Sequence, residues 1–123
     1  MKIVAIILAV ITVSVLIYNL FPLIQVIGDS MYFTYLDGEV IIGRRLYLKS
    51  NLKVGDVIVY RSPEDSSRKV IKRIADIKKD SNDYSFYCLG DNPPHSYDSR
   101  DYGYVPSKNL VCKIIKARPK KEN

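Results

Sequence analysis

Two residues of the sequence could together form a nucleophile and its base. Ser30 lies in the segment GDSM at residues 28–31, and Lys72 lies in VIKRI at residues 70–74. A serine hydroxyl is a poor nucleophile at neutral pH and needs a base beside it. If residues 69–77 form a strand, Lys72 shares a face with Val70 and Ile74, and burial among such side chains lowers a lysine pKa. The two residues could therefore act together as a Ser-Lys pair for acyl transfer.

Taken singly, the same residue types have simpler structural interpretations. A serine after Gly-Asp is commonly a turn or helix-cap residue, and a lysine in a strand is commonly an exposed edge charge. The one histidine, His95, follows two prolines and is interpreted as a solvated turn residue. Only the order of several motifs along the chain favours catalysis over these interpretations.

The elements that would hold the pair begin with an apolar N-terminal segment. Apart from Lys2, no residue before Asp29 is charged, and residues 3–28 are rich in Ile, Val and Leu. About 20 such residues cross the roughly 30 Å hydrocarbon core as a helix, so residues 1–28 are predicted to be a transmembrane anchor. A cleavable signal peptide is the alternative, but its apolar core is usually no longer than about 15 residues. Tyr18 and Pro22 predict that the last third of the segment reaches the membrane surface.

The remainder of the chain is predicted to be a small, mostly β domain over residues 29–116. Short runs rich in β-branched and aromatic residues alternate with turn signals, and no sustained helical periodicity is present. Strands are predicted at residues 40–48, 57–60, 69–77, 84–89 and 110–116. Residues 117–123 are predicted to be a basic, solvated tail.

Composition excludes several classes of protein. The chain has 123 residues, 47% of them hydrophobic, with 19 Lys and Arg against 13 Asp and Glu, and two cysteines. It is too short for a barrel enzyme, too poor in cysteine for a disulfide-rich scaffold and too apolar for a disordered protein. The basic residues interleaved with tyrosines at 44–60 are better explained by anionic lipid head groups than by nucleic acid, so no nucleic-acid partner is expected.

The cysteines and the glycines give no sign of a metal or cofactor site. Cys88 and Cys112 are interpreted as buried small hydrophobic residues, with a disulfide between them as the alternative. Neither lies in a metal-ligand pair, and no glycine-rich phosphate loop is present. No cofactor and no metal are therefore expected.

Four segments, taken in order, carry a resemblance to a known family. They are GDSM at 28–31, GDVIVY at 55–60, VIKRI at 70–74, and GDN at 90–92 continued by SYDSR at 96–100 and GYVP at 103–106. Together they resemble the type I signal peptidases, membrane-anchored serine endopeptidases that remove signal peptides from exported proteins. The resemblance implies that Ser30 attacks the scissile carbonyl. It also implies that Lys72 accepts the serine proton and later returns it to the leaving amine.

The resemblance extends to residues that support this chemistry. It implies that Ser96 orients the lysine and that Asp98 and Arg100 form a structural ion pair that holds their loop. Met31, next to the nucleophile, is expected to line the nearer of two shallow apolar pockets that admit Ala-like residues.

The backbone N–H of Ser30 is expected to hold the oxyanion. In some members a hydroxyl two residues before the serine assists, but Gly28 offers none. The family also has proline where this chain has Phe33, and a proline there would stiffen the chain after the nucleophile. The short interval after the lysine motif leaves no room for a second domain, so the chain resembles a minimal catalytic core.

The resemblance thus implies a cell-membrane, single-pass peptidase with a cytoplasmic N-terminus, an extracytoplasmic catalytic domain, and preproteins and the lipid bilayer as partners. The positive residues after the span favour the opposite orientation.

Two alternatives to a signal peptidase remain. One is a catalytically silent, membrane-anchored accessory or binding module of the same ancestry. The other is the self-cleaving Ser-Lys repressors, whose DNA-binding region has no counterpart here. The sequence carries no signal for an oligomeric state.

Overall fold

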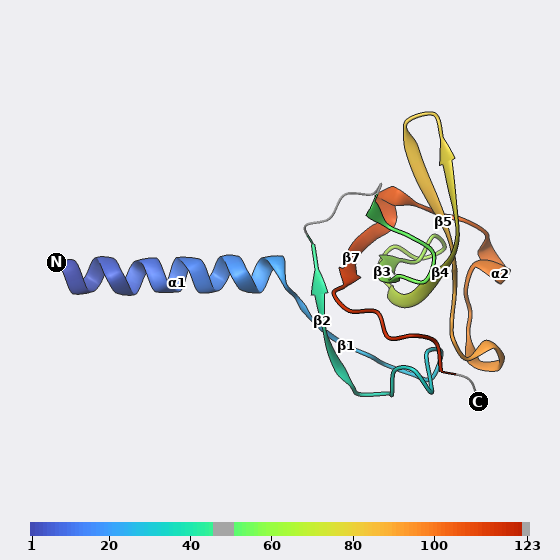
Figure 1. Cartoon of the computed structure of the whole chain (residues 1–123), viewed down its shortest axis with the longest axis horizontal. Helices are drawn as coiled ribbons and strands as arrows, with labels where there is room; N and C mark the ends of the chain where they lie inside the picture. The colour runs from blue at the N-terminus through green and yellow to red at the C-terminus, as the bar shows by residue number, and fades with distance from the viewer. Residues whose placement is uncertain (46–50, 122–123) are drawn as a thin grey trace.

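An N-terminal helix followed by a β-rich domain makes up the computed structural model, which describes residues 1–45 and 51–121 (Figure 1). The elements are α1 (Lys2–Leu20), β1 (Leu23–Gln25), β2 (Val40–Arg44), β3 (Val57–Arg61), β4 (Lys69–Asp80), β5 (Asp83–Leu89), η2 (Pro93–His95), α2 (Ser99–Tyr102), β6 (Val105–Pro106), η3 (Ser107–Asn109) and β7 (Leu110–Ile114). The mostly β class with one N-terminal apolar helix, as predicted from the sequence, is confirmed.

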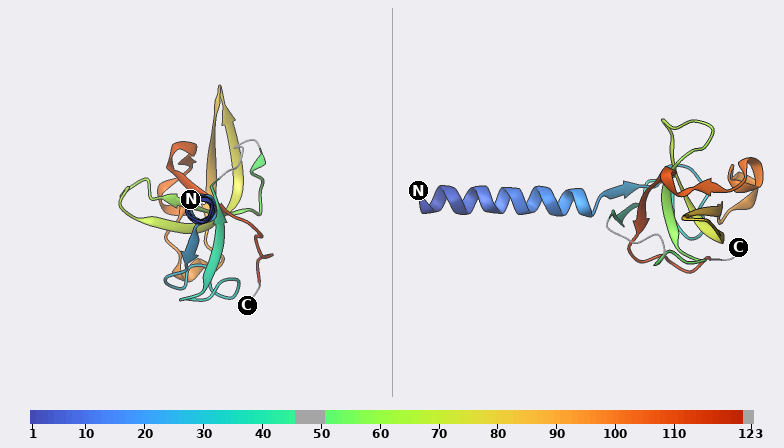
Figure 2. Two further views of the ribbon diagram at one scale, coloured as in Figure 1. Left: turned by 90° about the vertical axis from the view of Figure 1, so that its left-hand side faces the viewer. Right: turned by 90° about the horizontal axis from the view of Figure 1, so that it is seen from above.

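Helix α1 projects away from the β domain in Figure 1 and in the right-hand view of Figure 2, and none of its side chains is buried. With 19 residues, the helix is long and apolar enough to cross a membrane. The helix ends at Leu20, short of the predicted anchor boundary at residue 28. Pro22 explains the difference, because proline has no N–H for a helical hydrogen bond. The residues after it form β1, which pairs with β2 instead of continuing the helix.

The strands form one sheet in the order β1-β2-β7-β3-β4-β5-β6, in which all neighbours are antiparallel. The predicted strands are found at β2, β3, β4, β5 and β7, with shifted ends. The strand predicted at 40–48 is described as far as Arg44, and residues 46–48 lie outside the described part. Strand β4 runs on to Asp80 and forms a long hairpin with β5, which points upward in Figure 1. β7 ends at Ile114, before the predicted end at 116.

Strand β3 is the centre of the core because both of its faces are buried. Successive strand residues point to opposite faces. Accordingly, Val57 and Val59 pack in one apolar cluster with residues of β1, β2 and β7, and Ile58 and Tyr60 pack in a second with residues of β4, β5 and β6. β4 pairs with this buried strand, so the β4 side chains on the same face of the sheet as Ile58 and Tyr60 project into the second apolar cluster.

The segment after β7 differs from the predicted solvated tail. Arg118 donates its backbone N–H to the Tyr35 hydroxyl at 2.9 Å, and its guanidinium forms an ion pair with Glu39. Residues 118–121 are nevertheless exposed, as expected for a tail. The tail prediction rested on composition alone, which carries no information about distant partners.

Candidate active site

Ser30 lies in a turn that follows β1. Gly28 makes this turn with a φ of 87°, which glycine adopts without a steric penalty. The Gly28 N–H donates to Asp37 Oδ1 at 2.8 Å, and the Tyr32 N–H donates to the Asp29 carbonyl at 3.0 Å. Local hydrogen bonds thus fix the backbone on both sides of Ser30 and leave its side chain half-buried.

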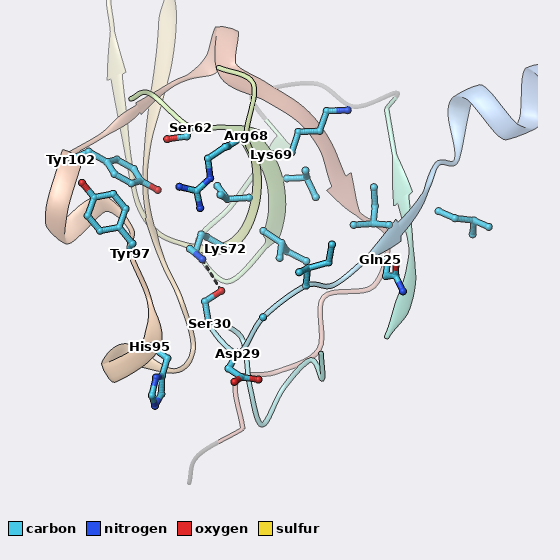
Figure 3. A pocket seen from close by; sticks show the side chains of 17 residues that line it. Gln25, Asp29, Ser30, Ser62, Arg68, Lys69, Lys72, His95, Tyr97 and Tyr102 are labelled. Carbon is cyan, nitrogen blue, oxygen red and sulfur yellow. Dashed lines mark hydrogen bonds between the residues drawn. The ribbon is translucent and has the colours of Figure 1, made fainter. Parts of the chain in front are cut away.

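Lys72 lies on β4, opposite Ile58 of β3. Its side chain shares a face with Val70 and Ile74, which belong to the second apolar cluster, as the strand alternation predicts. The residue is only 4% exposed. Its Nζ donates to Ser30 Oγ at 2.7 Å, the dashed contact in Figure 3. The nucleophile and base candidates therefore lie within hydrogen-bond distance.

Burial controls the protonation of this lysine. It lowers the pKa of Lys72 from 10.5 to about 8, although the nearby Asp98 carboxylate opposes the shift. The Arg68 guanidinium, which points toward Lys72 in Figure 3, adds to the lowering. Near neutral pH a useful fraction of the amine is then uncharged, and its lone pair can accept the Ser30 proton along the same 2.7 Å contact.

Asp98 is the fully buried centre of the loop beside the lysine. It accepts hydrogen bonds from the Gly90 N–H at 2.9 Å and from the Arg100 guanidinium at 2.9 and 2.5 Å. Burial alone would raise the pKa of Asp98, but these bonds, together with one from Ser96, hold it well below the ordinary value. Asp98 therefore stays charged and ties the loop to the end of β5.

Ser96 is close to the pair but bonded differently from the expectation. Its hydroxyl donates to Asp98 Oδ2 at 2.5 Å, and among the described residues no hydrogen bond joins it to Lys72. A side chain at Gly90 would meet Ser96 Oγ at 2.1 Å and the Ser30 carbonyl oxygen at 2.7 Å. Only glycine allows this loop to pack so closely against the nucleophile. The strong acceptor beside Ser96 explains why its hydroxyl turns away from the amine.

Asn92 joins the same loop to the backbone of the nucleophile. Its N–H donates to the Ser30 carbonyl at 2.9 Å, and its side-chain amide donates to the Asp29 carbonyl at 2.9 Å. Among the residues that the structure describes, no acceptor is bonded to the Ser30 N–H. The oxyanion role expected of this N–H stays a prediction, and Gly28 contributes only backbone.

Arg73 and Asp91 form a contact that the sequence analysis did not single out. The guanidinium pairs with both carboxylate oxygens at 3.0 and 2.9 Å and also donates to the Gly55 carbonyl at 2.8 Å. Arg73 follows Lys72 in VIKRI, and Asp91 is the acidic residue of GDN. The sequence signal for this pair was the presence of an arginine and an aspartate in these two motifs, because a planar guanidinium can bind both oxygens of a carboxylate.

A cleft of about 600 Å³ opens over the pair and is lined chiefly by residues around β1 and by the first half of β4 (Figure 3). Residues Lys69–Lys72 pair with β3 on one side, whereas pairing with β5 begins only at Arg73. The other edge of Lys69–Lys72 therefore faces the cleft. His95 lies exposed at the rim, and its ring points away from Ser30 in Figure 3.

Met31 does not take the position expected for a pocket residue. It is fully buried in the first apolar cluster, and its sulfur accepts the Asp91 N–H at 3.4 Å. A side chain without exposed surface cannot contact a bound peptide in this conformation. The turn around Ser30 directs Met31 under the site, and this direction depends on tertiary packing that the sequence does not reveal.

Both cysteines are free and buried, Cys88 in β5 and Cys112 in β7, in agreement with their interpretation as small hydrophobic residues. Burial raises the pKa of the Cys88 thiol to about 12, which makes it a poor nucleophile. Within residues 1–45 and 51–121, no group of three or more His, Cys, Asp or Glu side chains is arranged to hold a metal ion.

A family model and several curated proteins are similar to this chain. The model of the family "Signal peptidase, peptidase S26" matches residues 1–80. The chain is 34% identical to mitochondrial inner membrane protease subunit 1 of Schizosaccharomyces pombe, over 78% of this chain and 72% of that protein. It is also 34% identical to mitochondrial ATP-independent inner membrane protease subunit 1a of Arabidopsis thaliana, over 72% of this chain and 64% of that protein.

A shorter similarity joins the chain to signal peptidase I of Buchnera aphidicola. It is 47% identical over 32 residues and covers 26% of this chain and 10% of that protein. The inner-membrane relatives and the apolar helix α1 together support membrane association.

Proposed function

The chain belongs to the signal peptidase family, peptidase S26, and from this membership and the geometry of the site we propose that it is a membrane-bound serine endopeptidase that removes signal peptides from preproteins. Ser30 is the nucleophile and Lys72 is the general base. The observation that carries the proposal is the 2.7 Å contact between Lys72 Nζ and Ser30 Oγ, made by a lysine that is 4% exposed.

The reaction proceeds in two acyl-transfer steps. Ser30 Oγ attacks the scissile carbonyl carbon while its proton moves to the neutral Lys72 amine. The tetrahedral intermediate collapses as the C–N bond breaks, and the Lys72 ammonium gives the proton to the leaving amine. Water then attacks the ester, Lys72 takes a proton from this water, and collapse returns that proton to Ser30 Oγ. The nucleophile is thereby restored and no co-reactant other than water is needed.

Three groups support these steps. The free Ser30 N–H stabilises the oxyanion. The Asp98–Arg100 ion pair, with N–O distance 2.5 Å, fixes the loop beside the base. Ser96 donates its hydroxyl to Asp98 and acts as a positioning residue for the loop. Burial of Lys72 and Asp98 lowers the local dielectric and strengthens their interactions.

The substrate binds as an extended peptide along the open edge of Lys69–Lys72. This edge offers backbone donors and acceptors, as in peptide recognition by strand addition. Apolar side chains of the cleft, Ile24 of β1 and Ile71 of β4 among them, favour small apolar residues before the scissile bond. The proposed substrate class is therefore a preprotein with a small-x-small cleavage site.

The anchor keeps the site next to the bilayer. Helix α1 ends at Leu20 and Ser30 follows within a short strand and turn, so the nucleophile stays near the surface where a cleavage site emerges. We assign the β domain to the extracytoplasmic side with the N-terminus in the cytoplasm. Protease protection in intact cells tests this orientation, since a domain protected from added protease contradicts it.

Cleavage of a purified preprotein by the full chain in detergent tests the function. Wild type is expected to cut once, before the mature part, and Ser30→Ala and Lys72→Ala are each expected to lose roughly a thousandfold in rate. Lys79→Ala, an exposed lysine at the far end of β4, is the control and should keep the wild-type rate. Equal cleavage by all variants contradicts the residue assignment, and no cleavage by wild type favours the silent accessory module.

A further inference from the structure

The chain after β7 folds back onto the turn that carries the nucleophile. We define the C-terminal clamp as residues 117–121. The Arg118 N–H donates to the Tyr35 hydroxyl at 2.9 Å, and its guanidinium donates to the Thr34 carbonyl at 3.1 Å. The same guanidinium lies 4.9 Å from the Tyr35 ring centre and pairs with Glu39. The Lys121 N–H donates to Thr34 Oγ1 at 3.0 Å. Backbone and side-chain groups of the clamp thus bind one short segment, Thr34 and Tyr35.

That stretch is the end of the nucleophile loop, residues 29–35. Thr34 and Tyr35 are each 1% exposed, and both donate their N–H to the Met31 carbonyl, at 3.1 and 2.8 Å. Because of these hydrogen bonds, a displacement of Thr34 or Tyr35 would also move the backbone of Met31, the residue after Ser30.

Phe33 shows that the loop is strained. Its φ is 76°, a left-handed conformation that non-glycine residues rarely adopt and that persists only where the surroundings enforce it. Proline cannot adopt this φ, because its ring fixes φ near −65°. The loop therefore follows a path that a proline at this position would forbid, and it needs an external support.

The clamp also reaches the opposite side of the nucleophile. The Arg118 carbonyl accepts a hydrogen bond from the Arg73 guanidinium at 2.7 Å, and Arg73 holds Asp91. The next residue, Asn92, bonds the Ser30 carbonyl at 2.9 Å. Arg118 is thus linked to both segments that enclose Ser30, although it lies outside the cleft.

We propose that Arg118 is a positioning residue that holds the nucleophile loop so that Ser30 Oγ stays within reach of Lys72. The proposal rests on the proposed role of Ser30. Because Arg118 does not line the cleft, its loss changes the chemical step rather than substrate binding.

The test uses the full chain in detergent and two independent measurements. Arg118→Ala is expected to lower kcat roughly tenfold while KM changes less than twofold, at a temperature where thermal unfolding shows all variants to be folded. Hydrogen exchange followed by mass spectrometry should be faster in peptides covering residues 29–39 and unchanged in β4. Tyr35→Phe, which removes the acceptor of the Arg118 N–H, should shift both measurements the same way. Lys120→Ala, an exposed residue of the clamp, is the matched control and should shift neither.

The two measurements separate this proposal from the function on which it rests. A wild-type chain that cleaves no preprotein overturns the proposed function, and the exchange measurement still decides whether the clamp holds the loop. Unchanged exchange at residues 29–39 in Arg118→Ala overturns the clamp. Faster exchange with an unchanged kcat shows that the clamp is real but does not position the nucleophile, and this result also overturns the proposal.

Discussion

Replacing Lys72 by methionine is expected to inactivate the protein and at the same time to stabilise it at neutral pH. Methionine is unbranched and apolar, and it fills the space of the lysine stem without the buried ammonium. The pKa of Lys72 falls from 10.5 to about 8, and one pKa unit corresponds to about 1.4 kcal/mol. The charged lysine therefore costs the native state on the order of 3 kcal/mol at pH 6 to 7. Lys72→Met should recover much of this free energy of unfolding.

The pH dependence of the gain has a definite sign. Below about pH 8, Lys72 is charged in both the folded and the unfolded chain, so the full cost is present. Between about 8 and 10.5 the unfolded chain binds a proton that the folded chain has released, and the stability of wild type rises with pH. The advantage of Lys72→Met should shrink across this window and level off above it.

Urea unfolding of the full chain in detergent, followed by the near-ultraviolet circular dichroism of its 10 tyrosines, measures the free energy at each pH. Lys79→Met removes an exposed lysine from the same strand and should show no comparable change between pH 6 and 10. A Lys72→Met variant that is less stable than wild type at pH 6, or a difference that stays constant up to pH 10.5, would refute the burial argument.

Two further substitutions probe the loop beside the base. Gly90→Ala places a methyl group against Ser96 Oγ and the Ser30 carbonyl oxygen, so we expect a loss of roughly 1–3 kcal/mol in unfolding free energy and at least a tenfold slower cleavage. Asp98→Asn removes the carboxylate that pairs with Arg100 and should cost about 1–3 kcal/mol at pH 7. Because the folded pKa of Asp98 is depressed, wild type begins to lose this advantage as pH falls below 3.8 and loses it fully only below the folded pKa, so the stability curves of wild type and Asp98→Asn should approach each other progressively below pH 3.8. Denaturant titrations at pH 7 and below, with cleavage assays on the same samples, check both.

The strands could be predicted from the sequence where burial in the sheet produces a clear pattern of apolar residues. The alternation at residues 69–77 placed Val70 and Ile74 on the face of Lys72, and the apolar run at 57–60 marked a strand that is buried on both sides. The membrane boundary was less predictable. Leu23 and Ile24 are as apolar as the helix before them, and only pairing with β2 shows that they belong to the sheet.

The placement of the candidate nucleophile and base followed from motifs, but the contacts around them did not. Met31 was expected in a pocket, yet the turn at Ser30 directs it into the core. The clamp was missed because Arg118 meets Thr34 and Tyr35 across more than half of the chain. Composition describes such a segment as a basic tail, and only the folded structure brings its partners together.

The central claim is that the Lys72 amine is uncharged when it takes the Ser30 proton, and the pH dependence of kcat/KM for wild-type cleavage tests it most directly. The acid limb of this profile reports the pKa of the essential base in the free enzyme. We expect this limb to rise with pH through about 8, where burial sets the pKa of Lys72. A rate that is already maximal at pH 6, or one that falls as pH rises from 6 to 8, would contradict it.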